Sequence, residues 1–182
     1  IAVKGSFDDC QKIVKEFFND NNFRSKINMY GENSINWARI VCQIVYYFYS
    51  YFKLNKDSIS FSVPTGNFGD IYAGYVAKKM GLPINKLIVA TNENDILQRV
   101  INTGKYKPDK VKPSISPSMD IQVASNFERL LFYALGQDDR KVSLLMNHLS
   151  KKGFFKLDES TIQNIKKDFE AVKINDEATQ SI

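Results

Sequence analysis

The 182-residue chain is poor in the residues that build disulfide frameworks and metal sites. It contains two cysteines, Cys10 and Cys42, and a single histidine, His148. The cysteines lie far apart, without CxxC spacing or a neighbouring histidine, which favours reduced, buried thiols in a cytosolic protein over a disulfide or a zinc site. His148 lies in a helical pattern, where a surface position is much more common than a ligand position. We therefore expect no metal site and a cytoplasmic location.

The chain also lacks a long hydrophobic run and a concentrated basic patch. The aromatic stretch Tyr46–Phe52 is bounded by Gln43 and Lys53, so it is shorter than the about twenty residues that cross a bilayer. The net charge of +5 is spread over stretches that also carry acidic residues. The densest lysine region, Lys105–Lys112, includes a proline and an aspartate and is typical of a solvated loop. These patterns predict neither a membrane nor a nucleic acid as partner.

Hydrophobic residues, in contrast, make up 43% of the chain, which is enough for one globular domain with a buried core. Short apolar runs predict strands over residues 1–5, 27–30, 59–63 and 86–92. Amphipathic stretches between and after them predict helices over residues 7–19, 35–52, 70–80 and 95–103. Strands separated by single helices pair in parallel. We therefore expect an α/β fold with a doubly wound, mainly parallel sheet and helices on both faces.

Composition divides the chain into three regions. Residues 1–104 form the expected α/β core, residues 105–124 a proline-containing loop, and residues 125–182 a helical region with a frayed C-terminus. Within the last region, helices are predicted over residues 125–135, 139–149 and 161–169. The chain opens at Ile1, inside an apolar run and without methionine or a secretory segment. We therefore expect a processed product or a piece of a longer protein.

The most informative motif is a turn bracketed by glycines between an expected strand and an expected helix. Residues 60–74 read SFSVPTGNFGDIYAG, in which Gly66 and Gly69 enclose Asn67 and Phe68. Backbone N–H groups at a helix start lack acceptors within the helix, and the helix dipole favours an anion there. Glycine permits both close approach to a phosphate and the positive φ that a nest of amides needs. The pattern predicts a phosphate site at the carboxyl end of a strand, although turns without a ligand share this spacing.

The residues of this turn resemble the cofactor-phosphate loop of the threonine synthase family. These are pyridoxal-phosphate (PLP) enzymes of fold type II, the tryptophan-synthase-β-like fold. Four further blocks resemble the family in the same order: Gly5–Gln11, Asn33–Arg39, Ser116–Gln122 and Ser125–Phe132. The resemblance is clearest from residue 1 to about residue 135 and fades afterwards.

The resemblance implies an enzyme that converts O-phosphohomoserine and water to threonine and phosphate, with PLP as the electron sink. It implies that Gly66, Asn67, Phe68 and Gly69 hold the cofactor phosphate, mainly through backbone N–H groups. In the family, the Schiff-base lysine lies upstream of the part represented here and the partner of the pyridine nitrogen follows it. Neither is recognisable in this chain. We therefore expect the central part of the enzyme, inactive alone, with no catalytic residue and with the rest of the enzyme chain as its partner.

Two lysines lie in contexts that superficially resemble that of the family's Schiff-base lysine, but they do not change this expectation. Lys53 and Lys156 each follow a phenylalanine but have the wrong spacing and lie in amphipathic stretches, so we expect both on the surface. Asp70 would repel a bound phosphate, so we expect it to cap the following helix with its side chain turned away. Asn33, Ser34 and Asn36 precede a helix, so one of them is expected to be its N-cap; a direct active-site role for one of them stays open.

Other polar residues of the matching blocks have two open roles each. Ser116, Ser118 and Asp120 could face the cofactor cleft or could stabilise their loop through side-chain turns. Arg39 and Arg129 could bind the substrate phosphate or could form ion pairs on their helices.

Three other functions stay open. A threonine-synthase-like phospholyase would eliminate phosphate without making threonine, and product choice depends on where water is placed in a site outside this chain. A non-catalytic phosphate- or nucleotide-binding α/β domain would bind nucleotide by itself. A basic nucleic-acid-binding module ranks last and would show a steep salt dependence of its affinity.

Overall fold

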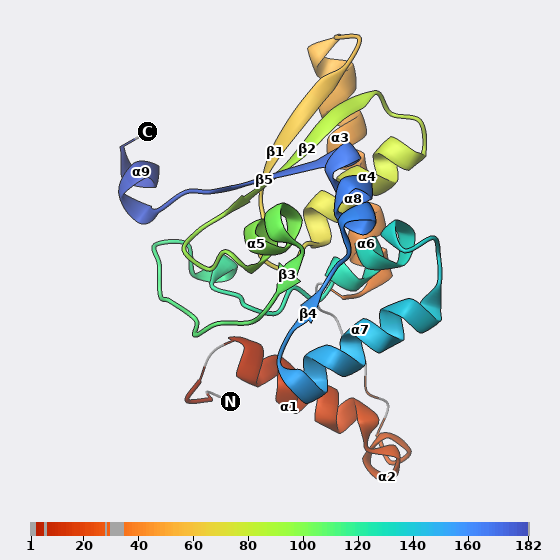
Figure 1. Ribbon diagram of the computed structural model, residues 1–182, viewed down its shortest axis with the longest axis vertical. Coiled ribbons are helices and arrows are strands. Elements are labelled where there is room, and N and C mark those ends of the chain that lie inside the picture. The colour runs from red at the N-terminus through yellow and green to blue at the C-terminus, as the bar shows by residue number, and fades with distance from the viewer. Residues whose placement is uncertain (1–2, 6, 28, 30–34, 182) are drawn as a thin grey trace.

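A three-stranded parallel sheet lies at the centre of the fold (Figure 1). This computed structural model describes residues 3–5, 7–27, 29 and 35–181. The strand order is β1 (Ile59–Pro64), β2 (Ile84–Thr91) and β5 (Phe169–Lys173), with β2 in the middle and both neighbours parallel to it. The α/β class and the parallel sheet are thereby confirmed. A separate antiparallel pair joins β3 (Lys105–Tyr106) to β4 (Phe155–Lys156).

Helices make up most of the remaining described structure. They are α1 (Phe7–Asn19), α2 (Asn21–Arg24), α3 (Trp37–Leu54), α4 (Gly69–Lys79), α5 (Ile96–Thr103), α6 (Phe127–Ala134), α7 (Asp139–Lys152), α8 (Glu159–Asp168) and α9 (Asp176–Gln180), with a 3-10 turn at Pro117–Met119. No helix of the described part is long and apolar enough to cross a membrane. The same part holds no group of three or more histidine, cysteine or acidic side chains that could bind a metal ion.

Helix α4 connects β1 to β2 and is buried against the sheet. Gly74 allows this close packing, because a Cβ there would lie 2.7 Å from Cζ of Tyr47 on α3 and 2.9 Å from Cδ2 of Leu87 on β2. Leu87 is in register with Phe61 on β1 and with Phe169 on β5, so these three side chains share the face that carries the helices. The main apolar core is built from this face together with buried residues of α3, α4, α5, α6 and α8.

The opposite face of the sheet carries more exposed side chains. Ser62, Ile88 and Glu170 are in register with one another and are exposed or half-buried. The next row on this face, Pro64, Ala90 and Val172, has the same character. These exposed rows make this surface the more open side of the sheet. Parallel sheets are usually covered on both faces.

Several predicted elements are found close to their expected bounds, and others were wrong. The strands predicted over residues 59–63 and 86–92 and the helices over residues 7–19, 35–52, 70–80 and 95–103 correspond to observed elements. Residues 3–5 form no strand, and residues 1 and 2 lie outside the described part. The strand predicted over 27–30 is absent at Ile27 and Met29, the two positions described there. Apolar character alone was insufficient at both places, because no strand of the described part pairs with these residues.

The C-terminal region was expected to be helical with a frayed end, and it also contains strands. Strand β5 pairs with β2 over five positions, and β4 pairs with β3. The end of the chain forms α9, whose N-cap Asn175 accepts a hydrogen bond from the N–H of Ala178 (2.9 Å). The last part of the chain therefore belongs to the central sheet.

Candidate phosphate-binding site

The glycine-bracketed turn lies at the carboxyl end of β1, immediately before α4. Thr65 continues the strand by donating its N–H to the Ala90 carbonyl of β2 (2.8 Å). Phe68 is the N-cap of α4 and has the left-handed values φ 65° and ψ 10°. The positive φ was expected at one of the two glycines of the turn, and this was wrong.

The Phe68 ring explains why a residue other than glycine takes this strained backbone. The side chain is only 1% exposed. Its ring centroid lies 5.4 Å from that of Phe127 on α6 and 5.6 Å from that of Phe169 on β5. Burial of an aromatic side chain contributes a few kcal/mol, about 3–5 by truncation data, which outweighs the about 1–3 kcal/mol of a left-handed residue. The turn is therefore anchored to the core at its centre.

The backbone N–H groups of the turn are unpaired within the described part of the chain. Among the described residues, none accepts a hydrogen bond from the N–H groups of residues 66–70. These residues border a cavity of about 150 Å³ that Arg39 and Gln43 of α3 also line. Unpaired amides at a helix start, with an arginine beside them, form a site whose chemistry suits an anion.

Gly66 is required by the loop behind the turn. A Cβ at this position would lie 3.0 Å from Cδ1 of Ile121, 3.2 Å from the Ser118 carbonyl oxygen and 3.3 Å from Cα of Met119. A side chain at residue 66 would therefore push the turn and this loop apart. The turn thus packs directly against residues 118–121.

Asp120 holds that loop in place. Its Oδ1 accepts hydrogen bonds from Nδ2 of Asn92 (2.8 Å), Nδ2 of Asn94 (3.1 Å) and Oγ of Ser114 (2.6 Å). Ser116 belongs to the same network, because its Oγ accepts from Asn92 Nδ2 (3.2 Å). Of the two roles left open, these contacts support loop stabilisation for Asp120 and Ser116.

Ser118 supports the turn through its backbone, since it is the Ser118 carbonyl oxygen that approaches Gly66. Asn36 is the N-cap of α3 and accepts a hydrogen bond from the N–H of Ala38 (3.0 Å). One of the three polar residues before α3 is therefore the expected cap. Asn33 and Ser34 lie outside the described residues.

Asp70 does not cap α4, contrary to expectation, because it lies inside the first turn after Gly69. The Tyr47 hydroxyl is 3.2 Å from its Oδ1 and 2.9 Å from its carbonyl oxygen, and donates to both. Burial raises the pKa of the Asp70 carboxyl, and the hydrogen bond from Tyr47 partly offsets this effect. Burial and the nearby Asp70 carboxylate also raise the pKa of Tyr47, so its hydroxyl stays protonated and remains a donor. The carboxylate is thereby held by α3.

Replacing Tyr47 by phenylalanine is expected to destabilise the protein in a pH-dependent way. The variant leaves two acceptors of Asp70 without this donor, at a cost of about 1–3 kcal/mol near pH 7. The pKa of Asp70 in the folded state, already above its ordinary value, should rise further. Since the lost hydrogen bond favours the charged carboxylate, the loss of stability should be smaller at acidic pH, as the folded protein binds the proton, and should grow as the pH rises through the folded-state pKa.

Urea unfolding of the Tyr47→Phe variant at pH 4 and pH 7 measures this difference. Tyr51→Phe, one turn further along α3, is the matched control and should show no such pH dependence. An equal loss of stability at both pH values would contradict the coupling between Tyr47 and Asp70.

The two arginines of the matching blocks have different surroundings. Arg39 is exposed and lines the cavity at the turn. Arg129 lies on α6, where its Nε donates to Oδ1 of Asn126 (3.1 Å) and its Nη2 to the Ile35 carbonyl (2.8 Å). Neither arginine forms a salt bridge within the described part of the chain. Among the described residues, ion pairing, one of the two expected roles, is therefore not observed for either arginine.

Sequence reasoning missed Gln43 and Tyr47. Together with Arg39 they are spaced four residues apart along α3, so they form one stripe that faces the turn. Polar atoms repeated at this spacing in an otherwise apolar helix were the available signal. The expected burial of both cysteines was also wrong, because Cys10 is half-buried and Cys42 is exposed; both are free thiols.

The sequence of this chain is similar to those of known threonine synthases. No family model matches the chain. The threonine synthase of Saccharomyces cerevisiae is 50% identical over 193 aligned residues, which cover 98% of this chain and 38% of that protein. The threonine synthase of Pseudomonas aeruginosa is 48% identical and is covered over 39% of its length. The chain therefore spans about two fifths of the length of these curated relatives.

Solved structures give the same result. A PLP-bound threonine synthase from Brucella melitensis superposes with a TM-score of 0.86 at 51% identity, over 96% of this chain and 38% of that one. The structure of yeast threonine synthase gives a TM-score of 0.86 at 48% identity, over 100% of this chain and 38% of that one. In sequence and in fold, the chain is thus similar to about two fifths of these threonine synthases, and it has the α/β organisation of the fold type II PLP enzymes.

Proposed function

We propose that the protein to which this chain belongs is a PLP-dependent threonine synthase, and that this chain supplies its cofactor-phosphate site. The reaction would convert O-phospho-L-homoserine and water to L-threonine and phosphate. The observation that carries the proposal is the set of unpaired backbone N–H groups at residues 66–70, in a chain about 50% identical to threonine synthases. A relative with 51% identity binds PLP.

The residues of the turn fit the phosphate group of PLP. The N–H groups of Gly66, Asn67, Phe68 and Gly69 would donate to the phosphate oxygens, and each such charge-assisted bond contributes about 1.5–3 kcal/mol. The positive end of α4 adds to the attraction. Arg39 lines the same cavity and supplies a full positive charge. When bound, PLP would supply an electron sink for carbanions, which permits loss of the substrate phosphate and addition of water.

The Schiff-base lysine would come from a part of the enzyme outside this chain. The cavity at the turn is lined by Arg39, Gln43 and residues 64–71, so no lysine is among its described lining residues. Lys53 lies in the last turn of α3, with its Nζ 5.6 Å from the centre of the Tyr49 ring. Lys156 lies on β4, and both lysines are exposed. These positions support the surface roles expected for both lysines.

The free thiols of Cys10 and Cys42 support a cytoplasmic location, because such thiols persist in reducing compartments. We propose O-phosphohomoserine as the small-molecule substrate, and neither a nucleic acid nor a membrane as partner. No specific observation favours the phospholyase, the nucleotide-binding domain or the nucleic-acid module.

The test is product analysis with the full-length protein. Supplied with PLP and O-phospho-L-homoserine, it should release phosphate and L-threonine in equal amounts, measured by a phosphate assay and chiral chromatography. Phosphate release together with an elimination product in place of threonine would identify the phospholyase. Saturable nucleotide binding without phosphate release would support the non-catalytic domain instead.

A further inference from the structure

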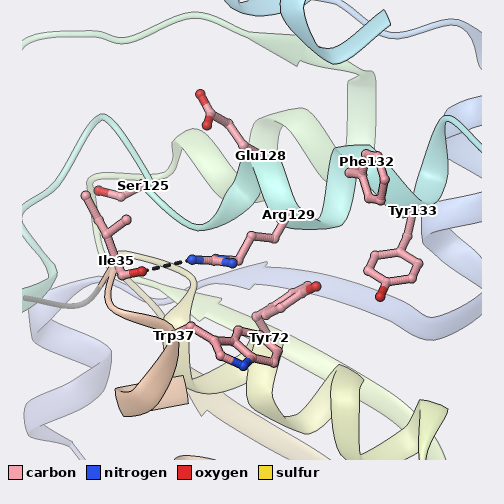
Figure 2. Close-up of a pocket in the computed structure, with 8 residues that line it drawn as sticks. All are labelled: Ile35, Trp37, Tyr72, Ser125, Glu128, Arg129, Phe132 and Tyr133. Atoms are coloured by element: carbon pink, nitrogen blue, oxygen red, sulfur yellow. Dashed lines mark hydrogen bonds between the residues drawn. The ribbon is translucent and has the colours of Figure 1, made fainter. Parts of the chain in front are cut away.

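A cavity of about 550 Å³ lies where α4 and α6 meet the start of α3 (Figure 2). Trp37 of α3, Tyr72 of α4 and Arg129 of α6 line it, and Figure 2 shows the Arg129 side chain reaching across to the Ile35 carbonyl. The guanidinium carbon of Arg129 lies 5.5 Å from the centre of the Trp37 ring. Arg129 therefore fastens α6 to the segment that leads into α3.

The other end of the same guanidinium acts on Asn126. Arg129 Nε donates to Oδ1 of Asn126, whose side chain is fully buried. Because the amide oxygen is engaged in this way, the amide nitrogen of Asn126 must point elsewhere. It donates to the Asn67 carbonyl oxygen (3.2 Å), and the backbone N–H of Asn126 donates to the same oxygen (3.1 Å). Arg129 thus fixes the orientation in which Asn126 binds the turn.

The two hydrogen bonds from Asn126 to the Asn67 carbonyl determine where the N–H group of the next residue points. In a trans peptide, the carbonyl of Asn67 and the N–H of Phe68 point in opposite directions across the same plane. No cis peptide bond occurs in the described chain. Since Asn126 holds the Asn67 carbonyl on its own side, the Phe68 N–H is directed away from Asn126. The Phe68 N–H is one of the unpaired donors of residues 66–70, which form the phosphate turn.

We propose that Asn126 and Arg129 are positioning residues for the cofactor phosphate. They act through the Asn67–Phe68 peptide and touch neither cofactor nor substrate. This inference rests on the proposed function, because it assigns a direction to one of the amides that would bind the PLP phosphate. It also gives Arg129 a role different from binding the substrate phosphate.

The experiment compares PLP with pyridoxal, which lacks the phosphate, in binding to the full-length apoprotein. Asn126→Asp keeps an oxygen facing Arg129 and places a second oxygen against the Asn67 carbonyl, so that this peptide is repelled. The dissociation constant for PLP should rise about 10- to 100-fold, the effect of losing one charge-assisted hydrogen bond. The constant for pyridoxal should change less than about threefold, which is smaller than the effect of losing a charge-assisted hydrogen bond.

Arg129→Lys is the second variant, since it keeps the charge but loses the fork that binds two oxygens. It should weaken PLP binding in the same selective way, to a smaller extent. The matched controls are Asn147→Asp and Arg140→Lys, which make the same changes at exposed positions of α7 and should leave both constants unchanged.

The two proposals fail in different ways. Equal weakening of PLP and pyridoxal by Asn126→Asp and Arg129→Lys, or no weakening of either, would overturn the positioning role while leaving the phosphate site intact. An unmodified apoprotein that binds pyridoxal as tightly as PLP would remove the phosphate site itself, and the positioning role with it.

Discussion

Replacing Gly66 by valine in the full-length protein should reduce PLP affinity at least about 100-fold. The valine side chain cannot fit beside Ile121 and the Ser118 carbonyl, which already lie 3.0 Å and 3.2 Å from the position of a Cβ. The turn must therefore move outward, and loss of two charge-assisted bonds to the phosphate, each worth about 1.5–3 kcal/mol, gives an effect of this size. Equilibrium dialysis of the apoprotein against PLP measures the change.

A suitable control places the same valine on the same strand, away from the turn. Ser62→Val, at an exposed position of β1, should keep PLP affinity within about twofold, since a surface substitution is nearly neutral. The far-ultraviolet circular dichroism of both variants should match that of the unmodified protein. Retention of PLP by Gly66→Val at normal affinity would exclude the turn as the phosphate site.

Truncating Phe169 to alanine should destabilise the protein by about 3–5 kcal/mol, the range for a buried phenylalanine. Phe169 is fully buried on β5. Its ring lies 5.6 Å from the ring of Phe68 and 5.4 Å from the ring of Tyr75 on α4. A cavity at this position would remove support from both the sheet and the phosphate turn, so PLP affinity should fall together with stability.

Urea unfolding of the Phe169→Ala variant measures the first effect, and PLP titration measures the second. Val172→Ala on the same strand is the control, because Val172 is 41% exposed and its truncation should cost less than about 1.5 kcal/mol. A Phe169→Ala variant as stable as this control would mean that β5 is not an integral strand of the sheet.

The elements around the turn could be predicted because their signals are local. Strand β1 is a short apolar run, α4 begins at Gly69, and Gly81 and Pro83 end the helix. Strand β5 has no comparable signal. Its five residues, Phe169–Lys173, alternate only briefly between apolar and charged side chains, and they follow a helix directly. Only pairing with β2, about eighty residues earlier, makes them a strand.

The candidate site was likewise predictable only where its signals are local. The residues of the turn are contiguous, so their spacing and their resemblance to the family could be read directly from the sequence. The contacts of Asn126, Tyr47 and Asp120 depend on how distant segments pack. The left-handed backbone at Phe68 was unpredictable for the same reason, because it is compensated by the rings of Phe127 and Phe169, which belong to other elements.

The buried Phe68 ring has a consequence for how the site captures its ligand. A loop that is pinned to the interior through its central side chain already has its final shape before an anion arrives, so little conformational entropy is lost on association. Backbone NMR order parameters across residues 66–70 should accordingly be high in the apoprotein and change little on adding PLP. Recognition here would be that of a rigid receptor, with selectivity set in advance by the folded interior.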